Sequence, residues 1–183
     1  MVKIVCEGSS DKNKIKELLR FLEIEHSDDN FVVMGNKSNI FKSNHDNYRT
    51  ILALIDADKI DRILFVVDAD YQKDNSEYGG YENTQNRLKE LIERLDIAKI
   101  SSWFISCNPN SKDGYLESLL LSTVDENLRN CYDEFLDCIE FKEKNQHKYI
   151  MEQLHKITKP NKPYDFGHEN FEGLREILIE LFS

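Results

Sequence analysis

Four short apolar runs divide the first 107 residues of the chain. They are rich in Val, Ile and Phe and occupy residues 2–6, 31–34, 62–67 and 103–105. Runs of this length, separated by segments of helical periodicity, are typical of parallel strands that are buried between two layers of helices. The pattern therefore predicts an α/β fold with a four-stranded parallel sheet and helices on both faces.

Leu and Ile recur at helical spacing between these runs, and only helical patterns follow the fourth run. We expect a helix that begins near Ser9, and further helices over 48–55, 81–95, 115–121, 125–139, 145–157 and 171–182. Two prolines predict a loop at 159–163, because proline disfavours helix at the residue before it. The sequence thus predicts one compact unit, with an α/β core at 1–107 and a helical extension at 108–183 packed on it.

Composition narrows the classes of function. The formal net charge is −10 over 183 residues, which repels polyanions at long range and argues against tight, unaided nucleic-acid binding. A metal-dependent nuclease remains open, because bound cations reverse the sign of an acidic site locally. No run approaches the roughly 18 apolar residues of a membrane span. Since Met1 leads directly into a strand-like run, we expect a cytoplasmic protein without a membrane association.

The four cysteines indicate neither a zinc ribbon nor a disulfide framework, because no C-x-x-C pair occurs among them. Cys131 and Cys138 are seven residues apart, on one face of a predicted helix. Free cysteines often pack as small hydrophobic residues, so we expect both thiols to be buried.

Acidic residues stand where two of the predicted strands end. Glu7 follows the first strand, and Asp68 and Asp70 follow the third. Ligands of parallel α/β sheets bind at the carboxyl ends of strands, so these carboxylates meet if the first and third strands are neighbours in the order 2-1-3-4. Extended backbone would send Asp68 and Asp70 to the same side. Converging carboxylates favour a hard, oxygen-seeking ion such as Mg²⁺, or Mn²⁺.

The Asp-Ala-Asp triplet occurs twice, and its position distinguishes the two copies. Asp56–Asp58 follows a helical run and is interpreted as a helix end, whereas Asp68–Asp70 follows a strand. Acidic residues are common in turns and helix caps, so the triplet alone carries little information. Only the strand-end copy is a candidate for a site.

The segment Glu7-Gly8-Ser9-Ser10-Asp11, followed about sixty residues later by an apolar strand and Asp68-Ala69-Asp70, resembles the TOPRIM domain of topoisomerases, primases and OLD-type nucleases. The resemblance covers residues 2–107. It implies a Rossmann-like TOPRIM fold, in which Glu7 is a metal ligand or general acid/base and Asp68 and Asp70 bind Mg²⁺. Catalytic roles at Glu7, Asp68 and Asp70 follow from the resemblance.

Small stand-alone bacterial TOPRIM-like proteins related to OLD-type nucleases are similar in a further respect. Their Gly-x-Leu-Glu segment after the fourth strand corresponds here to Gly114-Tyr115-Leu116-Glu117. The likeness implies that Asp11 and Glu117 add a second metal position. Two metal ions about 4 Å apart would activate a water and stabilise the leaving oxygen of a phosphodiester. Cys6 departs from the family, which has an acidic or small apolar residue there.

Two further segments are candidates for substrate contact. Lys112, in the loop after the fourth strand, could neutralise a scissile phosphate, although a solvated loop lysine is the simpler interpretation. The polar loop 71–80 is expected to shape substrate access.

The sequence favours a Mg²⁺-dependent nuclease and leaves two alternative functions open. One alternative is a non-catalytic TOPRIM-like module that acts through a protein partner, which the net acidity favours. Another is hydrolysis of small phosphorylated substrates, which the negative charge hinders less.

Overall fold

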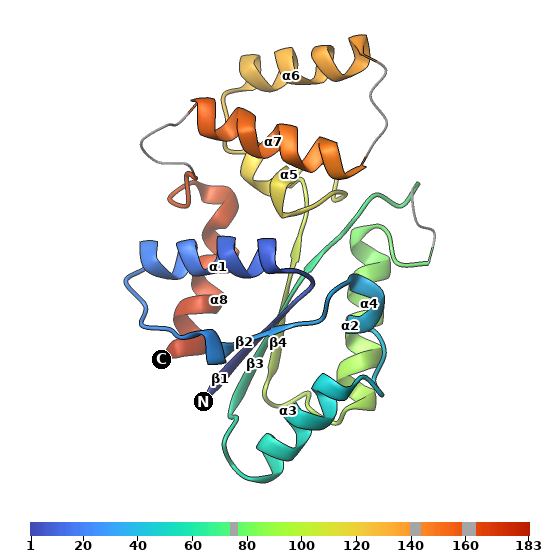
Figure 1. Ribbon diagram of the computed structural model, residues 1–183, viewed down its shortest axis with the longest axis vertical. Helices are drawn as coiled ribbons and strands as arrows, with labels where there is room; N and C mark the ends of the chain where they lie inside the picture. The colour runs from blue at the N-terminus through green and yellow to red at the C-terminus, as the bar shows by residue number, and fades with distance from the viewer. Residues whose placement is uncertain (74–76, 140–143, 159–163) are drawn as a thin grey trace.

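A four-stranded, all-parallel sheet is the centre of the computed structural model, which describes residues 1–73, 77–139, 144–158 and 164–183. The strands are β1 (Val2–Cys6), β2 (Phe31–Val33), β3 (Arg62–Asp68) and β4 (Ser101–Ser106), in the order β2-β1-β3-β4 (Figure 1). Cys6 pairs with Val66 in the register of β1 and β3. The predicted fold class and strand order are confirmed.

Side chains of the two central strands alternate between two hydrophobic layers, as the period of a strand requires. Ile4 and Leu64 face the layer that contains α1 (Ser9–Phe21) and α8 (Glu172–Phe182). Val5 and Phe65 face the layer that contains α3 (Asp46–Asp56) and α4 (Tyr81–Arg94). Figure 1 shows these helix pairs on opposite faces of the sheet, so both faces are covered as expected.

Three further helices lie beyond the carboxyl ends of the strands, at the top of Figure 1. They are α5 (Leu116–Leu121), α6 (Glu126–Cys138) and α7 (Lys144–Thr158). Leu121, Tyr132 and Met151, one from each helix, share a separate hydrophobic cluster. Leu116 and Leu119 of α5 instead join the layer of α1 and α8. The helices after residue 107 therefore contribute both to the main core and to a structure that covers one end of the sheet.

The structure adds short elements that the pattern does not predict. The helix α2 (Lys37–Ile40) follows β2, and single 3₁₀ turns form at Asp28–Asn30 and Glu169–Phe171. α2 is a four-residue helix, too short for helical periodicity to reveal. The α3 helix ends at Asp56, which confirms that the first Asp-Ala-Asp copy is a helix end.

One expectation about side chains is wrong. Cys131 and Cys138 are exposed, whereas Cys6 and Cys107 are buried. The buried face of α6 carries Tyr132 and Leu136 instead, so the two thiols lie on its other side. The proline loop predicted at 159–163 lies outside the described residues. None of the described helices is long and apolar enough to cross a membrane.

Candidate metal and catalytic site

Glu7 and Asp68 lie side by side at the carboxyl ends of β1 and β3. The parallel pairing of these strands brings the residue after β1 beside the last residue of β3. The backbone N–H of Asp68 donates to Glu7 Oε1 at 3.1 Å. Asp68 Oδ1 in turn accepts the backbone N–H of Leu116 at 2.8 Å, at the start of α5. The structure thus brings the two strand-end residues Glu7 and Asp68 into contact.

Four of the five predicted carboxylates border one cavity of about 500 Å³, and these are Glu7, Asp11, Asp68 and Glu117. Asp11 lies in the first turn of α1, where its Oδ2 accepts the Gly8 N–H at 2.9 Å. Glu117 lies in the first turn of α5. Tyr149 and Glu152 of α7 complete part of the wall. The cavity is therefore built where the α/β core and the helices beyond its strand ends meet.

Asp70 does not border this cavity. Its φ is 59°, in the left-handed region, so the expectation of extended backbone through Asp68–Asp70 is wrong. An antiparallel bridge to Gly114 fixes this turn, since Asp70 N–H donates to Gly114 O at 2.7 Å. Asp70 Oδ2 forms an ion pair with Lys37 Nζ at 3.2 Å.

Two buried lysines contact the acidic residues. Lys37, from α2, also donates to the carbonyls of Asp68 and Ala69, the latter at 2.8 Å. Lys14, from α1, donates to Glu117 Oε1 at 2.6 Å and to Ser10 Oγ at 2.6 Å. Both lysines and their carboxylate partners are buried.

The sequence indicates no role for Lys14. It offers Lys37 only as one of three basic residues after the second strand, with Lys42 and Arg49, that could contact a phosphate. A signal for Lys14 was present, because it shares the face of α1 that carries the buried Ile15 and Leu18. A lysine on an apolar helix face needs a partner. Lys37 offered no such signal, since its helix has a single turn.

The electrostatic environment holds a proton at Glu7. Burial, and then the neighbouring Asp68 carboxylate, raise the pKa of Glu7 to about 8, while Lys37 acts in the opposite direction. Burial also raises the pKa of the Cys6 thiol, to about 12, so Cys6 is a neutral thiol. Burial and the neighbouring carboxylate therefore disfavour the ionised form of Glu7 more than Lys37 favours it.

The donor set at the cavity fits one hydrated hard cation better than a closed metal cage. Among the residues that the structure describes, no three His, Cys, Asp or Glu side chains are grouped so that they could hold a metal ion. Mg²⁺ commonly uses one or two carboxylates and keeps several waters, and Glu7 with Asp68 supplies that number. Glu117, which the resemblance places with Asp11 at a second metal position, already has an ammonium partner, and this does not fit a second ion there. Asp70, which the resemblance places at the first position, also has an ammonium partner.

Lys112 does not border the acidic cavity. It is exposed, and its Nζ lies 5.8 Å from the centre of the Tyr81 ring. It lines a different cavity with residues of the loop 71–80, such as Gln72 and Gly79. The structure does not bring this lysine to Glu7 and Asp68.

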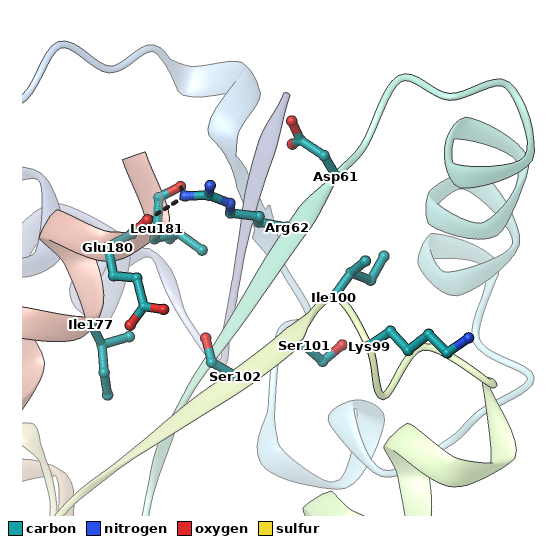
Figure 2. A pocket seen from close by; sticks show the side chains of 9 residues that line it. All are labelled: Asp61, Arg62, Lys99, Ile100, Ser101, Ser102, Ile177, Glu180 and Leu181. Carbon is teal, nitrogen blue, oxygen red and sulfur yellow. Dashed lines mark hydrogen bonds between the residues drawn. The ribbon is translucent and has the colours of Figure 1, made fainter. Parts of the chain in front are cut away.

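A cavity of about 280 Å³ lies at the opposite end of the sheet, where β3 and β4 begin (Figure 2). Arg62 donates there to the carbonyls of Glu180 and Leu181, at the end of α8. Asp61 pairs with the amino group of Met1 at 3.0 Å. These charged groups join parts of the fold, which favours the acidic end as the functional site.

A four-stranded parallel α/β protein with partly buried acidic residues at its central strand ends is the class that this fold and site define. A model of the family described as "Protein of unknown function (DUF3226)" matches residues 1–166, and the chain belongs to that family. No curated protein and no solved structure gives a match.

Proposed function

We propose that this protein is a divalent-metal-dependent phosphodiesterase that acts on nucleic acid. The observation that carries the proposal is the pairing of Glu7 and Asp68 at one wall of a cavity of about 500 Å³. Crevices at the carboxyl ends of parallel strands are the usual ligand sites of such sheets. The resemblance to TOPRIM nucleases supports the same chemistry.

Glu7 and Asp68 would hold the ion, and Asp11 borders the same cavity. A bound Mg²⁺ or Mn²⁺ would supply Lewis-acid activation of a water and stabilisation of a leaving oxygen. The hydrogen bonds from Asp68 N–H and Leu116 N–H orient the two carboxylates before any ligand arrives. Such preorganisation supports catalysis, because the groups need not rearrange during the reaction.

Glu7 is suited to proton transfer. A pKa of about 8 places its titration near neutral pH, where a general acid/base works best. At neutral pH, Glu7 would give up its proton when a cation binds and would then hold the ion as a carboxylate.

A nuclease assay with a metal titration tests the proposal. Labelled single-stranded and double-stranded DNA and RNA are incubated with the protein in millimolar Mg²⁺ or Mn²⁺, and again with EDTA. We expect cleavage that requires the metal and is lost in Glu7→Gln. The same ions should raise the melting temperature, since a ligand that binds only the native state stabilises it. Metal-independent cleavage, or no cleavage of any substrate, would contradict the proposal.

The second candidate is a non-catalytic module that binds a protein partner. One observation favours it: lysines already neutralise Asp70 and Glu117, so the acidic cluster is partly stable without a metal. If the protein is such a module, neither Mg²⁺ nor Mn²⁺ at millimolar concentration changes the melting temperature. The titration above therefore separates the two candidates.

A further inference from the structure

Three lysines are buried among the described residues, and two of them lie at the acidic site. Lys14 and Lys37 are 5% and 6% exposed, and Lys3 is 9% exposed. Lysine is rarely buried without a partner. Lys3 donates to the Asp29 carbonyl near the start of β1. The other two donate to groups at the carboxyl ends of the strands, where the five predicted carboxylates gather.

Lys37 occupies the Asp70 side of the site. Its Nζ contacts the carbonyls of Asp68 and Ala69 and lies 3.2 Å from Asp70 Oδ2. Three oxygens around one ammonium are the full set that its three N–H donors can serve. A metal ion on the same Asp70 oxygen would lie within roughly 5 Å of this ammonium, given a metal–oxygen distance of about 2.1 Å.

Lys14 occupies the Glu117 side. Its Nζ lies 2.6 Å from Glu117 Oε1 and 2.6 Å from Ser10 Oγ, and it joins α1 to α5 across the site. Glu117 is 4% exposed, so this ion pair is shielded from solvent. Charges that are removed from water interact more strongly than exposed ones. A second ion would have to displace or repel this ammonium.

We propose that Lys14 and Lys37 are built-in cations of the acidic site, so that the chain binds one divalent ion at Glu7 and Asp68 and excludes a second. This inference rests on the proposed function, because it concerns the same metal site. It departs from the two-metal arrangement that the resemblance implies, and it assigns a role to two residues outside the predicted set.

The formal charges agree with a single ion. With all five predicted carboxylates ionised, the two lysines leave the cluster at −3. Glu152, a further acid at the cavity, pairs with Lys156 Nζ at 2.9 Å, so this pair adds no net charge. One divalent ion reduces the charge of the cluster to −1, which suits a buried site. A second would make the cluster positive while both ammonium groups stay beside it.

Counting bound Mn²⁺ tests the inference without any activity measurement. Equilibrium dialysis, with free Mn²⁺ read by electron paramagnetic resonance, gives the ions bound per chain. We expect one in the wild-type protein and two in Lys37→Met, because Asp70 then becomes a ligand. In Lys14→Met the number of bound ions should likewise rise to two, because Glu117 then becomes a ligand. The matched control Lys3→Met removes a buried lysine at the other end of β1 and should stay at one.

Paired variants identify the cause of any second ion. Lys37→Met/Asp70→Asn and Lys14→Met/Glu117→Gln remove both charges of a pair, and each should bind one ion. These pairs also avoid a buried carboxylate that has lost its ammonium partner, which a single lysine variant leaves behind. If one single variant does not fold, the other still tests the opposite flank of the site.

The results distinguish a failure of the inference about the lysines from a failure of the proposed metal-dependent function. Two ions in the wild-type protein would overturn the role of the lysines and leave the metal-dependent function standing. One ion in the wild-type protein and in both single-lysine variants would also overturn it. No bound ion in the wild-type protein would instead contradict the proposed function itself.

Discussion

The two ends of the sheet carry charged groups of different kinds. At the amino end, Arg62 bonds to backbone carbonyls of α8 (Figure 2). Asp61 pairs with the amino group of Met1, and both Asp61 and Arg62 are exposed. At the carboxyl end, Asp68 is 4% exposed and lies against Glu7, a second acid. Opposite charges and helix ends stabilise a fold, whereas adjacent buried carboxylates oppose it. The carboxyl end therefore keeps a proton at Glu7 that a bound cation can replace.

The largest expected effect is on metal-dependent cleavage, which should depend on the carboxyl end of the sheet and not on the amino end. Asp68→Asn keeps an oxygen that can accept the Leu116 N–H, so the fold should persist. Loss of the carboxylate should lower metal-dependent cleavage by about 100-fold or more, as removal of catalytic groups commonly does. Asp61→Asn is the matched control and should retain wild-type activity. Initial cleavage rates at saturating Mg²⁺ measure both, and equal rates would show that Asp68 is not part of the machinery.

A second comparison sets the buried lysines of the two ends against each other. Lys37→Met leaves Asp70 buried without its ion-pair partner and should cost about 3 to 5 kcal/mol of unfolding free energy. Lys3→Met loses a hydrogen bond to the Asp29 carbonyl and should cost about 1 to 2 kcal/mol. Urea unfolding in EDTA measures both values. Equal losses of unfolding free energy would indicate that the Asp70 ion pair contributes no more to stability than the hydrogen bond of Lys3.

The contrast also explains how much of this site could be predicted. Glu7 and Asp68 were found because strand periodicity places both at strand ends and the order 2-1-3-4 makes those strands neighbours. Asp70 was placed wrongly, since a bridge to Gly114, 44 residues away, sets its left-handed backbone. Neighbours in sequence predict extended or helical backbone, but a long-range bridge can override them.

The ammonium partners were harder to predict for a related reason. The contact between Lys14 and Glu117 joins residues 103 positions apart, and that between Lys37 and Asp70 joins a one-turn helix to a strand end. Hydrophobic periodicity reflects local spacing along the chain, so it cannot indicate contacts between residues that are far apart in sequence. The strands and most helices, by contrast, follow local spacing, which is why the fold was predicted more fully than the contacts within the site.

A third prediction uses pH. Since the pKa of Glu7 is raised to about 8, the native state keeps a proton that the unfolded chain releases above pH 4.5. The unfolding free energy should therefore fall as pH rises from about 5 to 8, by on the order of 3 kcal/mol. At the amino end, the Met1 amino group lowers the pKa of Asp61. Asp61 therefore affects stability only below about pH 5.

Urea unfolding in EDTA at several pH values measures this slope. Glu7→Gln should flatten it, because glutamine does not titrate, whereas Asp61→Asn should leave it unchanged. Mn²⁺ should also flatten the slope of the wild-type protein, since the ion takes the place of the proton. A slope that persists in Glu7→Gln would assign the titration to another group.

The smallest expected effect concerns Arg62. Arg62→Gln removes a cation that donates to the last carbonyls of α8 and should cost about 1 kcal/mol. Lys99→Gln, in the same cavity, should change stability by less than about 0.5 kcal/mol, because the described residues give Lys99 no hydrogen bond or ion pair. Neither variant should alter the Mn²⁺-induced rise in melting temperature. A change in that rise would mean that the amino end is coupled to the acidic site through β3, which would remove the separation between fold-stabilising and ligand-binding charges.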